Sequence, residues 1–280
     1  MHAYAPVVGR MGRALSRRTF GRFRALIYRM SGIALSDGKE GLVRARVGKR
    51  MRALGLADYE DYLDRLEADV SGDEIIHLLD VISTNVTSFF REDSHFDYLA
   101  TLARRWAAER RSRLRLWSAA CSTGEEPCTM AMTLLESTEG GLPDLKILAT
   151  DLSTRALDRA RAGLYGPEKI AAVPRDLRSK YFDRDAKHPS AYRAGAELRR
   201  TITFARLNLA EPPFPMSGPF DAVFCRNVMI YFDAEVRRRL LAQIHDLLRP
   251  GGCLFVGHSE SLSGLTAGLK SVQAWIYVKS

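Results

Sequence analysis

The chain has 280 residues, 46% of them hydrophobic, which suffices for one large packed domain or for a domain of ~200 residues with a small partner domain. No apolar run reaches the ~18 residues of a membrane span, and the four cysteines form no C-x-x-C pair, which excludes membrane-spanning proteins and the common zinc-binding classes. The formal net charge is +9, and residues 1–55 carry 13 Lys/Arg against 2 Asp/Glu, so the excess charge indicates an acidic partner: nucleic acid, membrane or protein.

The first residues, "MHAYAPVVGRMGRALSRR", lack the apolar segment of a signal peptide. We therefore expect a cytoplasmic protein. In that compartment the cysteines are expected to be reduced, buried thiols.

Residues 1–83 show helical periodicity only. In residues 39–56, Val43, Val47 and Met51 lie on one apolar stripe, and Gly55 is a plausible helix stop. The opposite side of this predicted helix carries three basic residues that are spaced three positions apart: Arg46, Lys49 and Arg52. This basic face is either a docking surface for an acidic partner or simply a solvated helix face.

From residue 112 short apolar runs alternate with helical segments, which predicts a mostly parallel, doubly wound α/β sheet with ligands beyond the carboxyl ends of its strands. The expected strands lie in residues 114–119, 144–151, 201–209, 220–227, 251–258 and 272–280. The polar stretch 164–200 breaks this alternation and is expected to be an insertion with short strands of its own. The domains are thus a small all-α domain at 1–83 and an α/β domain at 84–280.

The loop after the first strand, "WSAACSTGEEPCTMAM", resembles a nucleotide-binding loop in position but not in composition. It has one glycine, Gly124, followed by Glu125 and Glu126, which would repel a phosphate. Carboxylates at a helix start also favour the helix dipole, so helix capping remains an alternative. As a ligand site, the loop favours a cation or a hydroxyl-rich group.

The second strand ends at Asp151, where dinucleotide-binding folds place the carboxylate that binds ribose hydroxyls. Ser153 can cap the following helix, which would leave Asp151 for a ligand. A nucleoside with positive charge and no phosphate fits both loops, and S-adenosylmethionine has these properties. The segment "TNVTSFFRE" offers Arg91, Asn85 and Thr87 for its carboxylate.

The strand at 220–227 leads into "FCRNVMIYF". Asn227 and Val228 are expected at the strand tip over the ligand, with Arg226 and Tyr231 as polar groups beside an apolar turn. For each of these two, a structural role remains an alternative.

These motifs, together with "ARLNL" and "LLRPGGCLFVGHSESL", resemble those of the CheR family, the chemotaxis receptor glutamate methyltransferases. The match spans residues 84–262 in the family's order, and the basic helical N-terminus is similar to the family's receptor-contacting domain. The resemblance implies a Rossmann-like S-adenosylmethionine-dependent methyltransferase fold and a cofactor pocket formed by Asn85, Thr87, Arg91, Glu125, Asp151, Asn208, Leu209, Asn227 and Val228. It also implies that Tyr231 and Arg226 lie near the transferred methyl group.

The resemblance further implies γ-glutamyl methyl ester formation on the cytoplasmic helices of chemoreceptors, with S-adenosylhomocysteine as the other product. Arg46, Lys49 and Arg52 would then contact the receptor, and 164–200 would be the β-subdomain that docks a receptor peptide in some members. No metal, general base, nucleic acid or membrane insertion is expected, and a monomer is the default.

Two other functions remain open. A nucleic-acid methyltransferase would suit the basic end, and "EPPF" (211–214) is similar to the proline loop of amino-group methylators. However, Glu211 stands where that loop has Asp or Asn, and the motif comes one strand too early. The other alternative is a non-catalytic S-adenosylmethionine-binding sensor or scaffold.

Overall fold

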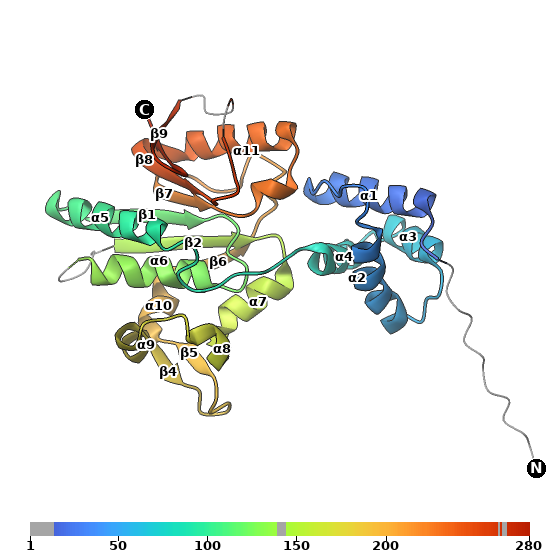
Figure 1. Ribbon diagram of the computed structural model, residues 1–280, viewed down its shortest axis with the longest axis horizontal. Helices are drawn as coiled ribbons and strands as arrows, with labels where there is room; N and C mark the ends of the chain where they lie inside the picture. The colour runs from blue at the N-terminus through green and yellow to red at the C-terminus, as the bar shows by residue number, and fades with distance from the viewer. Residues whose placement is uncertain (1–13, 139–143, 263, 265–267) are drawn as a thin grey trace, which may run out of the picture. The chain divides into compact units, whose positions relative to one another are not determined.

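The computed structural model describes residues 14–138, 144–262, 264 and 268–280. The prediction that the chain lacks a signal peptide concerns mainly residues 1–13, which lie outside these ranges. The chain divides into two compact units, one ending at Ile82 and the other comprising Ser83–Ser280 (Figure 1). This division falls one residue before the predicted boundary. None of the helices in the described ranges combines the length and apolarity of a membrane span.

The first unit is helical. Its helices are α1 (Arg17–Ser31), α2 (Glu40–Ala53), α3 (Tyr59–Glu67) and α4 (Asp73–Ile82). The predicted stripe of α2 is buried, because Val43 and Val47 are fully inaccessible and Met51 is 4% exposed. Gly55 follows α2 in the left-handed conformation (φ +70°), in agreement with the predicted helix stop.

The basic face of α2 is exposed only in part. Lys49 and Arg52 are exposed, whereas Arg46 is half-buried and donates to the carbonyl oxygen of Ile82 at 2.5 Å. Arg46 thereby satisfies the last carbonyl of α4, a common role for a basic side chain at a helix end. Of the three predicted receptor-contacting residues, two are therefore exposed to solvent.

The second unit contains a seven-stranded sheet in the order β6-β2-β1-β7-β8-β10-β9, in which only β10 runs antiparallel to its neighbours. The strands are β1 (Arg113–Ser118), β2 (Asp144–Asp151), β6 (Ile202–Arg206), β7 (Phe220–Cys225), β8 (Leu248–Val256), β9 (Leu269–Gln273) and β10 (Ile276–Lys279). The main helices are α5 (Ser94–Ala108), α6 (Glu125–Glu136), α7 (Thr154–Ala162) and α11 (Ala234–Leu247). The predicted doubly wound sheet is confirmed.

The strand order reverses between β1 and β7. From β1 the chain proceeds outward through β2 to β6, and from β7 it proceeds the other way through β8. Such a reversal opens a crevice at the carboxyl ends of the two central strands, where α/β folds bind ligands.

Aromatic side chains pack around the central strand β7 in the core. Every residue of β7 is buried, as expected for a central strand covered on both faces. Phe224 stacks on Phe255 and Phe96, with ring centroids 4.2 Å and 5.8 Å apart. All four cysteines are buried and free, which confirms the prediction.

The predicted insertion folds as a small subdomain. Its three strands form an antiparallel sheet in the order β3-β5-β4: β3 (Leu164–Tyr165), β4 (Phe182–Arg184) and β5 (Tyr192–Ala194). Three short helices accompany them: α8 (Pro167–Ile170), α9 (Arg175–Tyr181) and α10 (Ala196–Thr201).

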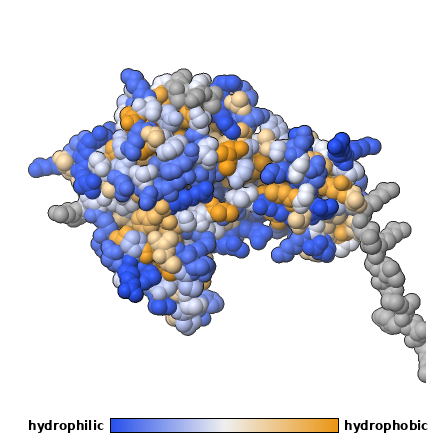
Figure 2. Space-filling model, viewed as in Figure 1, coloured by the Kyte–Doolittle hydropathy of each residue, from blue (hydrophilic) through white to orange (hydrophobic). Residues whose placement is uncertain are grey.

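The prediction of a single last strand at 272–280 is wrong. A two-residue turn at Ala274 and Trp275 divides the segment into β9 and β10, which pair as a hairpin. Trp275 occupies the left-handed region (φ +62°) without the glycine that would have indicated the turn in the sequence. Figure 2 shows polar and charged side chains over most of the visible face of each unit, with apolar side chains in separate patches.

Candidate active site

The loop after β1 turns sharply into α6 at Gly124. Gly124 has φ +94°, and a Cβ there would lie 2.9 Å from the Tyr165 hydroxyl and 3.1 Å from Cβ of Ala160. Only glycine fits this position without displacing its neighbours. The turn sets the direction in which the next two residues, Glu125 and Glu126, enter the helix.

Glu125 lies toward the insertion. Its side chain is inaccessible to solvent, accepts a hydrogen bond from the Thr123 hydroxyl at 2.6 Å and forms an ion pair with Lys169 of α8. Glu125 is predicted to bind the cofactor, but in the structure both of its carboxylate oxygens already have partners within the protein.

Glu126 lies on the other side, in a cluster that we call the Arg226 cluster: Glu92, Glu126 and Arg226. The Arg226 side chain is 1% exposed and pairs with Glu92 at 3.0 Å and with Glu126 at 3.1 Å. It also donates to the carbonyl oxygen of Arg91. Ser118, the last residue of β1, donates to the second oxygen of Glu126 at 2.7 Å.

The two carboxylates of the Arg226 cluster differ in acidity. Burial raises the pKa of Glu126, and the attraction of Arg226 does not fully offset this effect. Burial also disfavours the charged form of Glu92, but the Arg226 guanidinium and hydrogen bonds from Asn227 and Arg226 hold its pKa below the usual value. The cluster thus has two carboxylates that share one guanidinium, and burial disfavours the charged form of one of them, Glu126.

Asp151 ends β2 and is 8% exposed. Its carboxylate accepts the backbone N–H of Ser122 at 2.8 Å and of Ser153 at 2.9 Å, and so ties the β1 loop to the β2 turn. Ser153 caps α7 through the N–H of Ala156, as predicted.

A second buried carboxylate, Glu260, organises the loop after β7. It accepts the backbone N–H groups of Asn227, Val228, Met229 and Gly257 at 2.6–2.8 Å. Burial raises its pKa, while these four hydrogen bonds favour the ionised form.

Asn227 has φ +56°, and its side-chain amide donates to Glu92 at 3.1 Å. A Cβ at position 257 would lie 2.5 Å from this amide nitrogen, so Gly257 is required for the close approach. Of the predicted strand-tip residues, Asn227 is thus held between Glu92 and Glu260, and Val228 is held by Glu260.

Tyr231 ends the short 3-10 helix Met229–Tyr231 that follows. It is half-buried, and among the residues that the structure describes its hydroxyl has no hydrogen-bond partner. It is therefore available to a ligand. Arg226 differs, since a side chain that is almost inaccessible and bound to two carboxylates is not placed as expected for direct contact with a substrate.

The segment 84–92 lies against the β1 loop. The carbonyl oxygen of Asn85 accepts from the Ser122 hydroxyl at 3.2 Å, and Arg91 donates to the carbonyl of Val86 at 2.9 Å. Asn85, Thr87 and Arg91 are half-buried. The neighbouring Phe89 is in the core and packs edge-on against Tyr165 at 4.9 Å.

Asn208 and Leu209 follow the edge strand β6. Asn208 accepts the N–H of Ala210 at 3.1 Å, and Leu209 is 5% exposed. In the adjacent "EPPF" loop, Phe214 is buried and packs against Trp117 at 5.7 Å. That contact gives the loop a structural role.

The sequence reasoning missed Glu92, Glu260 and Lys169 as members of the site. Glu92 directly follows Arg91 in "FFRE", and Glu260 lies in "HSESL", so both stood inside motifs already identified. Lys169 stood in the polar insertion without a distinguishing pattern.

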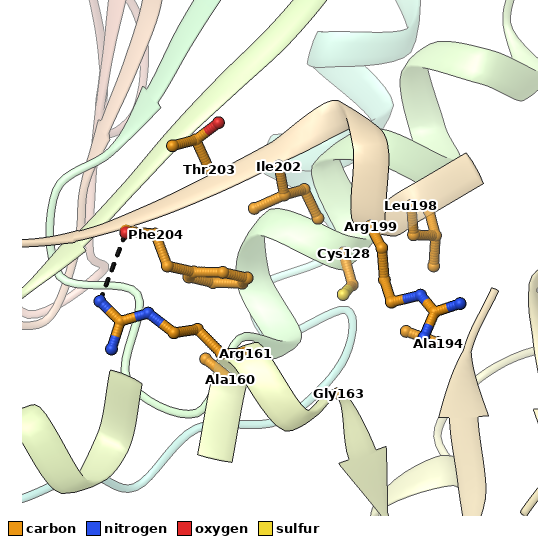
Figure 3. A pocket seen from close by; sticks show the side chains of 10 residues that line it. All are labelled: Cys128, Ala160, Arg161, Gly163, Ala194, Leu198, Arg199, Ile202, Thr203 and Phe204. Atoms are coloured by element: carbon orange, nitrogen blue, oxygen red, sulfur yellow. Dashed lines mark hydrogen bonds between the residues drawn. The ribbon is translucent and has the colours of Figure 1, made fainter. Parts of the chain in front are cut away.

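A pocket of about 330 Å³ lies elsewhere, between α7, β5, α10 and β6 (Figure 3). Leu198, Ile202 and Phe204 form apolar parts of its wall, and Arg161 reaches across to the carbonyl of Phe204 at 3.4 Å. No predicted site residue lines it, so it is distinct from the group of residues at the carboxyl ends of β1 and β7.

The sequence was also compared with known proteins. Residues 85–278 match the family described as CheR methyltransferase, SAM binding domain, and residues 18–83 match CheR methyltransferase, all-alpha domain. Chemotaxis protein methyltransferase 2 of Pseudomonas aeruginosa is 40% identical over 98% of this chain and 97% of its own length. The chemotaxis protein methyltransferase of Escherichia coli is 42% identical over 90% of this chain and 87% of its own.

Proposed function

The chain belongs to the CheR methyltransferase family, and on that premise we propose that it methylates glutamate side chains in the cytoplasmic helices of a chemoreceptor. The protein is an S-adenosylmethionine-dependent methyltransferase. The proposal adds the acceptor atom, a glutamate carboxylate oxygen, and the partner, a membrane chemoreceptor to which the enzyme is recruited from the cytoplasm.

The excess of carboxylates over guanidinium groups in the Arg226 cluster is the observation that carries the proposal. Two carboxylates and one guanidinium lie at the carboxyl ends of β1 and β7, and Asp151 lies at the end of the adjacent β2. This arrangement suits a cationic nucleoside, with Asp151 for ribose hydroxyls and the cluster for positive charge. It does not suit a phosphate-bearing ligand.

When bound, S-adenosylmethionine supplies a methyl group on a positively charged sulfur, so that an ionised carboxylate can take it by in-line displacement and leave neutral S-adenosylhomocysteine. A glutamate side chain is ionised at neutral pH, since its reference pKa is ~4.3, and needs no general base. The protein's contribution is then to position the groups and to exclude water around the carboxylate.

We assign Tyr231 to the acceptor, because its hydroxyl is unpaired among the described residues and can donate to a carboxylate. Arg226 is a positioning residue, because it holds Glu92 and Glu126, and Glu92 in turn holds the side chain of Asn227. Asn85, Thr87, Arg91, Asn208, Leu209 and Val228 complete the proposed cofactor pocket.

The exposed charges of Lys49 and Arg52 support a second part of the proposal, the docking of an acidic receptor helix on α2. Complementary charges raise the rate of encounter and select the partner more than they add affinity. Arg46 contributes less directly, because it also caps α4.

The test is a transfer assay with full-length protein, methyl-labelled S-adenosylmethionine and a chemoreceptor cytoplasmic fragment. Alkali releases methyl esters as volatile methanol, whereas N-methyl and nucleic-acid methyl groups stay in solution. We expect volatile label that requires both proteins and is lost when the fragment's acidic methylation sites are changed to alanine. A chelator is expected to leave the transfer unchanged.

Alkali-stable label, or label transferred to nucleic acid, would replace the proposal with the nucleic-acid alternative or another acceptor. Tight cofactor binding without transfer to any receptor fragment would instead favour the non-catalytic sensor.

A further inference from the structure

Three potential metal ligands meet beside the Arg226 cluster. Glu92 precedes α5, His95 is the second residue of α5, and His258 follows β8. One ligand atom from each lies within 4.8 Å of the other two. We propose that Glu92, His95 and His258 form a binding site for a divalent transition-metal ion of the zinc type, whose occupation weakens the binding of S-adenosylmethionine.

His95 provides independent support for this site. Its side chain is 1% exposed, and neither of its ring nitrogens has a hydrogen-bond partner among the described residues. The distance from its Nδ1 to Glu92 is 3.7 Å, too long for a hydrogen bond. A buried imidazole without partners is costly unless a ligand or an ion satisfies it.

The surroundings leave an entry path for an ion. His258 is exposed, and its ring stacks on Trp275 with centroids 4.1 Å apart. Its ring meets that of His95 edge-on at 5.2 Å. Zinc–nitrogen bonds of ~2.1 Å place tetrahedral ligand atoms about 3.4 Å apart, and a rotation of the exposed His258 can bring its ring nitrogen toward the other two ligands.

Two imidazoles and one carboxylate are a common ligand set for Zn²⁺ and its neighbours in the first transition series. The charge of the site is also suitable, because Glu92 shares the single guanidinium of Arg226 with Glu126. The ion is not required for methyl transfer in this scheme.

Coupling to the cofactor follows from the contacts of Glu92. The same carboxylate accepts from Arg226 at 3.0 Å and from Asn227 at 3.1 Å. An ion on Glu92 would compete with both contacts and would add positive charge where the proposed cofactor also brings it. The coupling rests on the proposed cofactor site, whereas the metal site itself does not.

The experiment uses tag-free full-length protein, stripped of metal and titrated with Co²⁺, whose visible absorption reports its coordination, and then with Zn²⁺ as competitor. We expect one saturable equivalent and a loss of affinity of about tenfold or more in His258→Ala. His258 is exposed, so this variant is expected to fold, and the exposed His188→Ala in the insertion is the matched control.

The absence of a one-equivalent site, or equal affinities in the wild type and His258→Ala, would overturn the proposal. A separate titration of S-adenosylmethionine with and without Zn²⁺ tests the coupling. Equal cofactor affinities in that titration would overturn the coupling. Neither metal titration depends on methyl transfer, so failure of the proposed function would appear separately.

Discussion

The two units of the molecule each contain an arginine that is paired with buried carboxylate, and the pairings differ in stoichiometry. In the helical unit Arg50 binds Glu74 through two nitrogens, at 2.9 Å and 2.7 Å, and Tyr62 donates to the same carboxylate at 2.7 Å. In the α/β unit a single guanidinium, that of Arg226, is shared by Glu92 and Glu126.

The difference shows in acidity. Burial opposes the charge of Glu74, but the hydrogen bonds from Arg50 and Tyr62 hold its pKa below the usual value. In the Arg226 cluster the pKa of Glu126 is raised and that of Glu92 is lowered. A balanced pair serves the fold, whereas an unbalanced cluster is suited to a charged ligand, and groups with divergent pKa values are typical of functional sites.

The largest expected effect is that of Arg226→Met. Removing this guanidinium leaves two buried carboxylates unpaired, and we expect unfolding to become easier by about 3–5 kcal/mol, together with a loss of cofactor binding. Urea denaturation of the full chain measures the first effect and calorimetric titration the second. Arg155→Met, an exposed arginine on α7, is the control, and an equally small loss in both variants would contradict the role of the cluster.

Two tyrosines extend the comparison. We expect Tyr231→Phe to lower kcat by about a hundredfold with little change in stability, because it removes one donor to the acceptor carboxylate. Tyr62→Phe is expected to have the opposite pattern: it should lower the free energy of unfolding by about 1 kcal/mol and leave the cofactor affinity unchanged. Wild-type turnover in Tyr231→Phe would remove this residue from the proposed mechanism.

The balanced pair predicts a specific pH dependence. Because the folded pKa of Glu74 is lowered, its stabilising contribution is complete above the unfolded pKa of ~4.3 and is lost as the pH falls through the folded value. We expect Glu74→Gln to cost about 2 kcal/mol at pH 7 and to make the acid decline of stability shallower. Denaturation curves of both proteins between neutral and acidic pH give the comparison, and parallel declines would argue against the pair.

The unbalanced cluster is tested by Glu126→Gln, which is close in size and removes one charge. We expect the dissociation constant for S-adenosylmethionine to rise by about tenfold, because a cationic ligand loses part of its electrostatic attraction. The affinity for neutral S-adenosylhomocysteine should change much less. Equal losses for the two ligands would indicate a packing defect and would count against the electrostatic explanation.

The smallest effects concern the exposed charges of α2. Charge reversal by Lys49→Glu with Arg52→Glu is expected to raise KM for a receptor fragment a few-fold and to weaken its salt dependence, because exposed charges are screened. Lys270→Glu, an exposed lysine of β9, is the control. A flat salt response in the wild type would remove the docking role of this face.

The sequence by itself determined the class of fold and predicted where the site lies. Hydrophobic periodicity predicted the helices of the first unit and the alternating strands of the second, because these patterns depend on residues close together in the chain. Acidic residues at the ends of two strands predicted a crevice for a cationic nucleoside, and Ser153 was identified as a cap. The turn at Trp275 was missed, because no glycine or proline indicates it.

Only the tertiary structure decided how the charges are distributed. Glu125 and Glu126 are adjacent, but successive helix residues point about 100° apart, so one faces Lys169 and the other faces Arg226. Arg226 and Glu92 are separated by 134 residues, and Glu260 reaches Asn227 across 33. Such contacts depend on the strand order of the sheet, which local sequence patterns do not encode, and this is why Arg226 is buried among carboxylates rather than exposed to a substrate.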